Sequence, residues 1–177
     1  GALAGALVSL AYSSPLLGIV AAAMAGASLA VVFGGLTVVL RCDQVVSGLI
    51  LVALGAGITG LLGRNIVGQT LPGFRDVDLG VISDLPVVGP LIFSQNTLTY
   101  FSFLFAAVAW WWMYRSVGGL RLRAVGESPS TADANGINVI TTRFLAVVVG
   151  GGFCGLAGGY LALASSFVWV EGMIAGR

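Results

Sequence analysis

The segment GALAGALVSLAYSSPLLGIVAAAMAGASLAVVFGGLTVVL, from Gly1 to Leu40, contains no charged residue. Its one polar break is the short run YSSP at residues 12–15. A helix needs about 20 apolar residues to cross the hydrocarbon core of a bilayer. We therefore expect the end of one membrane-spanning helix at Gly1–Ala11 and a second spanning helix at Leu16–Leu40.

The composition of the whole chain extends this interpretation. The chain has 177 residues, of which 58% are hydrophobic and 8% are charged, and its mean hydropathy is +1.02. Soluble domains carry about a quarter charged residues, so this chain has too few to cover a surface that faces water. We predict an all-α, polytopic transmembrane helix bundle in which residues 1–177 form a single domain. Because the sequence opens without Met inside an apolar run and ends on MIAGR, we also expect it to be truncated at both ends.

Three further runs are long enough to cross a membrane. Val45–Gly63 and Phe144–Ala164 contain no charged residue, and Thr97–Tyr114 ends in the sequence WWWMY before Arg115. Aromatic side chains followed by Arg are typical of the boundary between hydrocarbon and headgroups. The sequence therefore predicts about five spans in this stretch of chain.

Two polar segments separate the later spans, at residues 64–96 and 115–143. If the spans alternate in direction, one side of the membrane holds Arg41, Arg115, Arg121, Arg123 and Arg143, and the other holds Arg64, Arg75 and Arg177. Cytoplasmic loops carry the excess of basic residues. We therefore expect residues 115–143 to be a cytoplasmic loop and residues 64–96 to be a periplasmic loop.

The charged residues also exclude several function classes. The net charge is +1, so nothing indicates a surface for nucleic acid, and the chain has no His. All eight basic residues are Arg, and a phosphate-binding P-loop requires Lys. Cys42 and Cys154 lie in different segments without neighbouring ligands, so we expect two free thiols with neither a disulfide nor a metal site. We expect no metal, no cofactor and no enzymatic activity in this chain itself.

Small residues recur at every fourth position in two of the predicted spans. Gly151, Gly155 and Gly159 form one stripe in the fifth span, and Ala22, Gly26, Ala30 and Gly34 form another in the second. Such stripes allow another helix to approach closely. They indicate either plain helix packing or an interface that moves during function. The pattern G-x-G-x-x-G at residues 150–155 lies inside a span, which excludes a dinucleotide site.

The predicted spans contain no Asp, Glu or Arg near their middle. Proton-coupled transporters and pumps usually carry ionisable groups within the membrane, so this absence weighs against that class. Hydroxyl and amide side chains remain as candidates for a polar pathway for a solute, namely Thr59, Asn96, Thr97 and Ser102. More often such residues bond to their own helix or sit at its end, so the residues of the solute pathway stay unknown.

The sequence GLRLRAVGESPSTADANGINV, residues 119–139, is a polar island in this apolar chain. Leu120–Ala124 alternates apolar and basic residues, which is an extended or helix-terminal pattern. Ser128 suits a helix N-cap, Pro129 suits the first helical position, and Asn135-Gly136 suits a stop with Gly136 in the left-handed conformation. Two turns of helix are unstable alone in water. Either the flanking spans and the membrane surface hold this helix, or it docks into a partner protein.

This island resembles the cytoplasmic loop of the permease subunits of bacterial ABC importers, in the branch for simple sugars and nucleosides that is related to ribose and branched-chain amino acid permeases. Twelve positions match the loop pattern of that family: Gly119, Leu120, Leu122, Arg123, Ala124, Val125, Gly126, Glu127, Pro129, Ala132, Gly136 and Ile137. Thr131 departs from it, because Ala is usual there. The resemblance continues through DQVVSGL, LPVVGPLIF, GGGFCGLAGGYLAL and EGMIAGR, and so covers nearly the whole chain.

The resemblance implies a location, partners and a role for the short helix. It implies a multi-pass protein of the bacterial cytoplasmic membrane that translocates a small polar solute by alternating access. It implies two ATPase subunits that hold ATP and Mg²⁺, a second permease subunit that makes a homodimer or a heterodimer, and a periplasmic or lipoprotein substrate-binding protein. The short helix would be a coupling helix that sits in a groove of the ATPase subunit. The coupling residues would be Glu127, Ser128, Pro129, Ala132, Asp133, Gly136 and Ile137, with Arg121 and Arg123 as interface charges or as anchors to anionic lipid.

Two other functions remain open from the residues alone. For a secondary transporter or channel, we would expect solute uptake to be driven by ion gradients and no ATPase to copurify with the protein. A membrane scaffold that transports nothing would show no ATP hydrolysis stimulated by a solute in any complex. The sequence does not identify the solute, although the lack of charged residues within the spans favours a neutral sugar or nucleoside.

Overall fold

Every regular element that the structure describes is helical. The computed structural model describes residues 1–64, 66–68, 97–166 and 169. In chain order the elements are α1 (Ala2–Tyr12), α2 (Pro15–Gly34), a π-helical turn η1 (Gly35–Val39), α3 (Gln44–Gly63), α4 (Thr97–Arg115), α5 (Val117–Glu127), α6 (Pro129–Ala134), α7 (Val139–Tyr160) and a second π-helical turn η4 (Leu161–Ser165). The predicted all-α class is confirmed for these residues.

Three helices in the described part of the chain are long and apolar enough to cross a membrane. They are Pro15–Val39, Gln44–Gly63 and Val139–Ala164, and α1 is a shorter apolar helix. These three correspond to the second, third and fifth predicted spans. The predicted fourth span is the 19-residue helix α4, whose Trp and Tyr side chains carry polar N–H and O–H groups and make it less apolar than the other three. The total of five spans stays a prediction.

The helix α7 begins at Val139, although the sequence predicted that the span begins at Phe144. The reason lies in Asn138, whose side-chain oxygen accepts a hydrogen bond from the backbone amide of Thr141 at 3.0 Å. An Asn at this position satisfies an amide that has no partner inside the helix, and so starts the helix earlier. Arg143 therefore lies on α7 rather than in the loop before it.

The alternation of apolar and basic residues at Leu120–Ala124 lies within α5, so the extended interpretation of this segment is wrong. Ser116 caps α5, because its hydroxyl oxygen accepts a hydrogen bond from the amide of Gly119 at 3.0 Å. A cap of this kind stabilises a helix start by about 1 kcal/mol, which outweighs a short alternating pattern. The polar island is thus two helices, α5 and α6, in place of one loop with one short helix.

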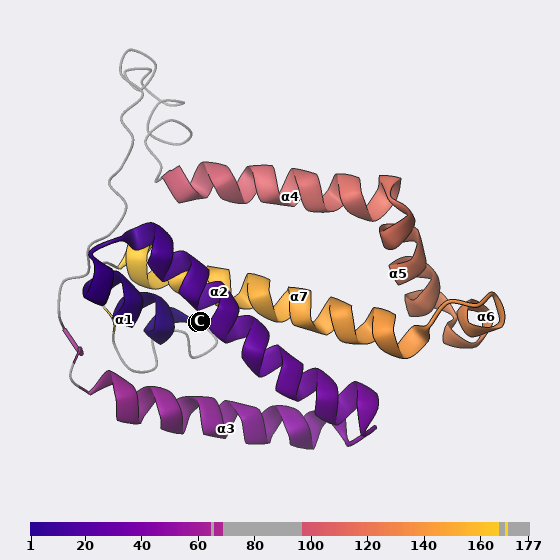
Figure 1. Ribbon diagram of the computed structural model, residues 1–177, viewed down its shortest axis with the longest axis horizontal. Helices are drawn as coiled ribbons and strands as arrows, with labels where there is room; N and C mark the ends of the chain where they lie inside the picture. Colours follow the sequence, from indigo (N-terminus) through magenta and orange to yellow (C-terminus); the bar gives the residue numbers. More distant parts are fainter. Residues whose placement is uncertain (65, 69–96, 167–168, 170–177) are drawn as a thin grey trace, which may run out of the picture.

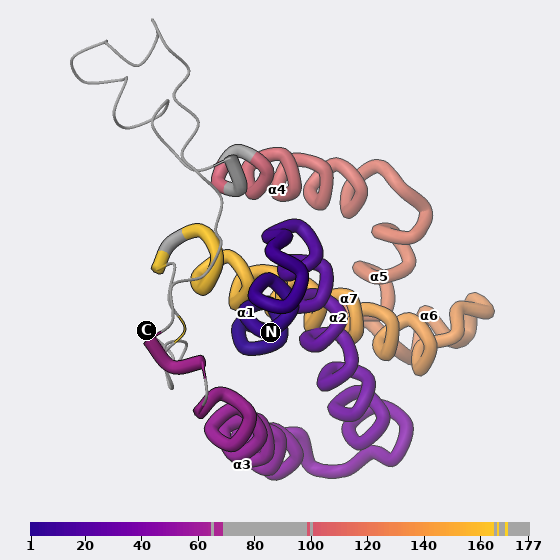
Figure 2. Tube along the Cα trace, turned by 60° about the vertical axis from the view of Figure 1, so that its left-hand side comes forward, coloured from indigo at the N-terminus to yellow at the C-terminus, as the bar shows by residue number. Residues whose placement is uncertain are grey.

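The helices α2 and α7 lie side by side and form the centre of the molecule, as both views show (Figures 1 and 2). Their stripes of small residues face each other. A Cβ atom on Gly155 would collide with the carbonyl oxygen of Ala22, and one on Gly151 would collide with the Cβ of Ala30. A Cβ on Gly159 would lie 2.8 Å from the Cβ of Ala22. The two backbones approach so closely that only Gly fits at the α7 positions.

A small buried cluster closes one end of this pair. It joins α1, η4 and the residues after α3, and its members are Ala2, Leu3, Ala6, Ile66, Ala162, Leu163 and Trp169. The opposite end is polar. There α2 ends, α3 begins, α4 passes into α5, and α6 precedes the start of α7, at the right of Figure 1.

The two ends carry the arginines in the way that the sequence predicted. Arg41 follows η1, Arg115 ends α4, Arg121 and Arg123 lie on α5, and Arg143 lies near the start of α7, so all five belong to the polar end (Figure 1). Arg64 follows the last residue of α3, at the other end. Arg75 and Arg177 lie outside the described residues.

Candidate functional site

The short helix α6 begins as its sequence predicts. Ser128 is the N-cap, and its hydroxyl oxygen accepts a hydrogen bond from the amide of Thr131 at 3.4 Å. The hydroxyl groups of Ser128 and Thr131 also lie 2.8 Å apart, within hydrogen-bond distance. Pro129 occupies the first turn, where its missing N–H costs nothing. The start of α6 is therefore fixed by its own side chains.

The end of α6 is a Schellman motif. The amide of Gly136 donates a hydrogen bond to the carbonyl of Asp133 at 2.9 Å, and the amide of Ile137 donates one to the carbonyl of Ala132 at 3.0 Å. Gly136 has φ +78°, the left-handed conformation that this motif requires and that a side chain disfavours. The Asn135 side chain adds a bond to the carbonyl of Thr131 at 2.7 Å. Both ends of this six-residue helix are thus closed.

One side of α6 is held by the rest of the chain and the other is free. Ala132 is 3% exposed, Val125 on α5 is 1% exposed, and Ile137 is half-buried. The exposed residues of the helix and its cap are Ser130, Thr131, Asp133, Ala134, Asn135 and Gly136. The chain itself therefore holds α6, and the helix presents a polar, uncovered surface.

Arg121 and Arg123 on α5, the predicted interface charges, have different surroundings. The guanidinium carbon of Arg123 lies 4.8 Å from the centre of the Tyr114 ring, a cation–π contact that ties α5 to the end of α4. Arg121 and Glu127 are exposed on α5. Among the described residues, neither Arg121 nor Arg123 forms an ion pair; Arg123 is held over the Tyr114 ring, whereas the charge of Arg121 is available to a partner or to lipid.

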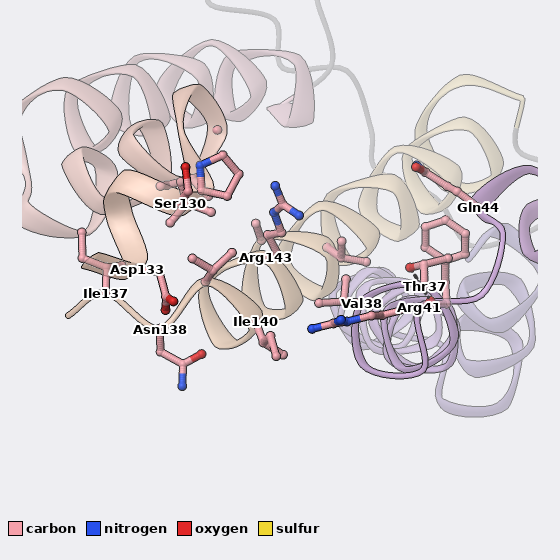
Figure 3. A pocket seen from close by; sticks show the side chains of 18 of the residues that line it. Thr37, Val38, Arg41, Gln44, Ser130, Asp133, Ile137, Asn138, Ile140 and Arg143 are labelled. Atoms are coloured by element: carbon pink, nitrogen blue, oxygen red, sulfur yellow. Dashed lines mark hydrogen bonds between the residues drawn. The ribbon is translucent and has the colours of Figure 1, made fainter. Parts of the chain in front are cut away.

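A groove of about 1180 Å³ lies at the polar end of the molecule, between α6 and the end of α2 (Figure 3). Its walls come from η1 and the following turn, from α5 and α6, and from the start of α7. The residues that carry polar groups into it are Thr37, Arg41, Gln44, Ser130, Asp133, Asn138 and Arg143. Sequence reasoning placed Arg41, Asp133 and Arg143 on one side of the membrane but did not bring them into one groove, because that depends on how α2 crosses α7.

A second groove, of about 840 Å³, separates α4 from α7 and is lined mainly by apolar side chains. Two contacts bridge it. The rings of Phe105 and Phe153 meet edge to face with centroids 6.0 Å apart, and the hydroxyls of Thr99 and Tyr160 lie 3.1 Å apart. The Ser102 hydroxyl, one of the predicted pathway groups, donates to the carbonyl of Thr99 at 2.7 Å within α4. Its hydrogen bond is therefore made inside its own helix.

The other predicted pathway and site residues are placed as follows. The Thr59 hydroxyl donates to the carbonyl of Gly55 at 2.8 Å, again within its own helix. The side chain of Thr97, the residue Asn96 and most of the predicted periplasmic loop 64–96 lie outside the described residues. In the described part of the chain, no group of three or more His, Cys, Asp or Glu side chains could hold a metal ion. Cys42 and Cys154 are free and exposed thiols.

Comparison with known proteins supplies the family. Residues 1–176 match the family described as the branched-chain amino acid transport system / permease component. The chain is 39% identical over its full length to the putative glucose ABC transporter permease protein TsgC13 of the archaeon Haloferax volcanii. It is 32% identical over 95% of its length to the guanosine ABC transporter permease protein NupQ of Bacillus subtilis, and 34% identical over 93% of its length to the nucleoside ABC transporter permease protein NupC of Lactococcus lactis. No solved structure matches it significantly.

The extent of these matches is also informative. The chain covers 55%, 54% and 53% of the lengths of the three relatives, so it spans about half of each. The relatives come from bacteria and from an archaeon, so the family is not confined to bacteria. The family match and the three apolar helices identify a multi-pass membrane protein. The chain belongs to the family of permease components of the branched-chain amino acid transport system.

Proposed function

We propose that this chain is part of the membrane-spanning permease subunit of an ABC importer. Its family is defined by a permease component, and its relatives include permeases named for ABC transport of glucose, guanosine and nucleosides. The solute is a small neutral molecule rich in hydroxyl groups, either a sugar or a nucleoside. The helices α2, α3 and α7 carry no charged residue near their middle, which suits a neutral solute better than a charged one.

The observation that carries the mechanism is the helix α6, whose two ends are capped and of which one side is packed against the rest of the chain. Its caps and its buried Ala132 make it a rigid body joined to α5 and α7, and its exposed surface is free to contact another protein. A rigid element transmits force from a partner to the helices that it connects. In this proposal α6 is the coupling helix, and ATP-driven closure of the ATPase subunits moves it and, through α7, the centre of the bundle.

Within this coupling site the residues divide into two roles. Ser128, Pro129, Ala132, Gly136 and Ile137 give α6 its shape and its anchor. The contacts with the ATPase come from Glu127 and Asp133, together with Arg121 and Arg123 on α5. All four charged side chains are exposed.

The stripes of small residues support the same mechanism. Gly151, Gly155 and Gly159 bring α7 into backbone contact with α2. Small residues at a helix interface let the two backbones pack in close contact. Movement of α6 would therefore be passed to α2 along this contact.

The proposal includes partners and an orientation. Two ATPase subunits hold ATP and Mg²⁺ on the side of the five arginines, which is the cytoplasmic side. A second permease subunit completes the pathway, and a substrate-binding protein docks on the opposite side, where residues 64–96 form part of its seat. The membrane is the cytoplasmic membrane of the cell.

Copurification and ATP hydrolysis test this function. The full-length protein expressed with its ATPase partner should hydrolyse ATP faster when loaded binding protein is added. Asp133→Arg reverses a charge on the exposed side of α6 and should weaken retention of the ATPase chain during purification, whereas Arg64→Glu reverses a charge at the other end of the molecule and should retain the ATPase chain like the wild type. Solute uptake driven by an ion gradient, without any ATPase chain in the purified complex, would assign the chain to secondary transport instead.

A further inference from the structure

The groove between α6 and the end of α2 has both charged and apolar lining residues. Its charged and polar lining residues include Arg41, Gln44, Asn138 and Arg143. Its apolar lining residues are Phe33, Val38, Ala146 and Val147 on the α2–η1 and α7 walls, and Leu122, Val125, Pro129 and Ile137 on the side of α5 and α6. Charged and apolar groups in one groove suit a molecule with an anionic head and a hydrocarbon tail.

The two arginines enter this groove from opposite walls. Arg41 comes from the turn after η1, and Arg143 comes from α7. Figure 3 shows the Arg41 side chain extending toward the α7 wall near Ile140, while Arg143 rises from α7 beside α6. Both side chains are exposed, and among the described residues neither forms an ion pair. Two basic residues thus line the same groove, and neither charge is compensated by an ion pair among the described residues.

The acidic groups nearby do not cancel this charge. The residues that line the groove include one carboxylate, Asp133, and two arginines, so their charges sum to a positive value. Asp43 follows Arg41 closely in sequence but caps α3, where its Oδ1 accepts hydrogen bonds from the amides of Val45 at 2.9 Å and Val46 at 3.0 Å. The groove therefore attracts an anion.

The backbone at Arg41 is held in an unusual conformation. Its φ of +54° is a left-handed conformation that residues other than Gly rarely adopt. The turn is held on both sides, because the amide of Leu40 donates to the carbonyl of Gly35 at 2.9 Å and the amide of Cys42 donates to that of Leu36 at 2.9 Å. Strained residues that are held in this way concentrate at functional sites.

The position of the groove separates a lipid from a soluble anion. Two of its walls are the ends of candidate membrane-spanning helices in the described part of the chain, Pro15–Val39 and Val139–Ala164, and the rest of its lining comes mainly from α5 and α6. Arginines at such ends lie at the level of the lipid phosphates. A free phosphate would use only the charged residues, whereas a phospholipid would place its headgroup at the charged residues and an acyl chain along the apolar ones.

We infer that this groove binds an anionic phospholipid, with its phosphate between Arg41 and Arg143 and an acyl chain along Val38, Ala146 and Val147. The bound lipid joins the end of α2 to the α6–α7 junction. This inference concerns lipid binding and does not depend on the proposed transport function. It does assign a second ligand to the end of the molecule where the ATPase is proposed to act.

The test is lipid binding to the purified full-length protein by native mass spectrometry. The probes are phosphatidylglycerol, phosphatidylcholine with the same acyl chains, and inorganic phosphate. Arg41→Gln and Arg143→Gln should each weaken phosphatidylglycerol binding about fivefold, as expected for one basic residue near an anionic headgroup. The double variant should lose about 25-fold, since the two effects add in free energy. The matched control is Arg64→Gln, an exposed arginine at the other end of the molecule, which should bind like the wild type.

Further variants keep the inference falsifiable if the double variant fails to fold. Arg41→Lys with Arg143→Lys keeps both charges and should retain at least part of the preference for phosphatidylglycerol over phosphatidylcholine. Val38→Trp narrows the apolar part and should weaken phosphatidylglycerol binding while leaving phosphate binding unchanged. Equal phosphatidylglycerol affinity in Arg143→Gln and Arg64→Gln would overturn the inference.

Two other outcomes would also overturn the lipid inference, because each would identify a different occupant of the groove. If inorganic phosphate displaced phosphatidylglycerol at equal concentration, the groove would be a site for a soluble anion. If Arg41→Gln and Arg143→Gln weakened retention of the ATPase chain but left phosphatidylglycerol binding intact, the groove would be a protein interface.

Discussion

The backbone amide of Ile137 donates a hydrogen bond to the carbonyl of Ala132 at 3.0 Å and so closes the end of α6. The bond reaches back across Gly136, which turns the chain with a φ of +78°. Ala132 is buried and Ile137 is half-buried, so the same two residues also anchor the helix to the chain. One local motif thus sets both the length of the candidate coupling helix and its direction into α7.

Gly136→Ala should destabilise this motif. The left-handed conformation brings a Cβ close to the following carbonyl oxygen and costs about 1 kcal/mol. No neighbouring atom lies within 4 Å of such a Cβ, so the backbone conformation is the sole source of the cost. We expect the melting temperature to fall by about 2–4 °C, and amide hydrogen exchange of Gly136 and Ile137 to become faster.

Gly126→Ala is the matched control for this prediction. Gly126 lies in α5, a Cβ atom added there would meet open space, and this residue is not among the described glycines with positive φ. Ala in a helix is better than Gly by about 1 kcal/mol, so this variant should melt at the same or a higher temperature. Equal losses in the two variants would show that the conformation of Gly136 does not matter.

Gly155→Ala should disturb the contact between α2 and α7. The added methyl group would collide with the backbone of Ala22 and Ala23, which cannot move aside as a flexible side chain can. Overpacking of this kind costs about 1–3 kcal/mol. Gly150→Ala, on the same helix with open space around its Cβ, should be neutral or stabilising. Thermal melting in detergent compares the two, and an unchanged melting temperature for Gly155→Ala would contradict the close approach.

The free thiols test the orientation. Cys42 is exposed in the turn between η1 and α3, at the end that carries five arginines, while Cys154 is exposed on α7 within a candidate span. A membrane-impermeant maleimide should label Cys42 in inverted vesicles and leave it unlabelled in intact cells, and it should not react with Cys154 in either. Cys42→Ser should remove the signal. Labelling of Cys42 from outside intact cells would reverse the proposed orientation.

Local features were the part of this fold that the sequence predicted best. The start at Ser128-Pro129 and the stop at Asn135-Gly136 depend on atoms within a few residues, so their signals are complete in the sequence itself. The same holds for the uncharged runs that became α2, α3 and α7. The start of α7 was misplaced because Val139–Arg143 is less apolar than the span, and the cap formed by Asn138 was overlooked.

Relations between distant segments were not predictable in the same way. Each stripe of small residues indicated that some helix approaches closely, but neither indicated that Gly155 lies against Ala22. Likewise the count of arginines placed Arg41 and Arg143 on one side of the membrane without placing them in one groove. Both facts depend on the crossing of α2 and α7, which no short pattern encodes.

Photo-crosslinking from α6 tests the coupling claim most directly. Ser130 is exposed on α6 and would be replaced by a photo-reactive residue in the full-length protein, expressed with its ATPase partner. Val67, exposed near the end of α3 away from α6, is the matched position. We predict that the residue at Ser130 crosslinks to the ATPase chain, with a yield that changes on addition of ATP, and that the residue at Val67 does not. An ATPase chain that copurifies but crosslinks from neither position, or equally from both, would contradict a role for α6 as the coupling helix.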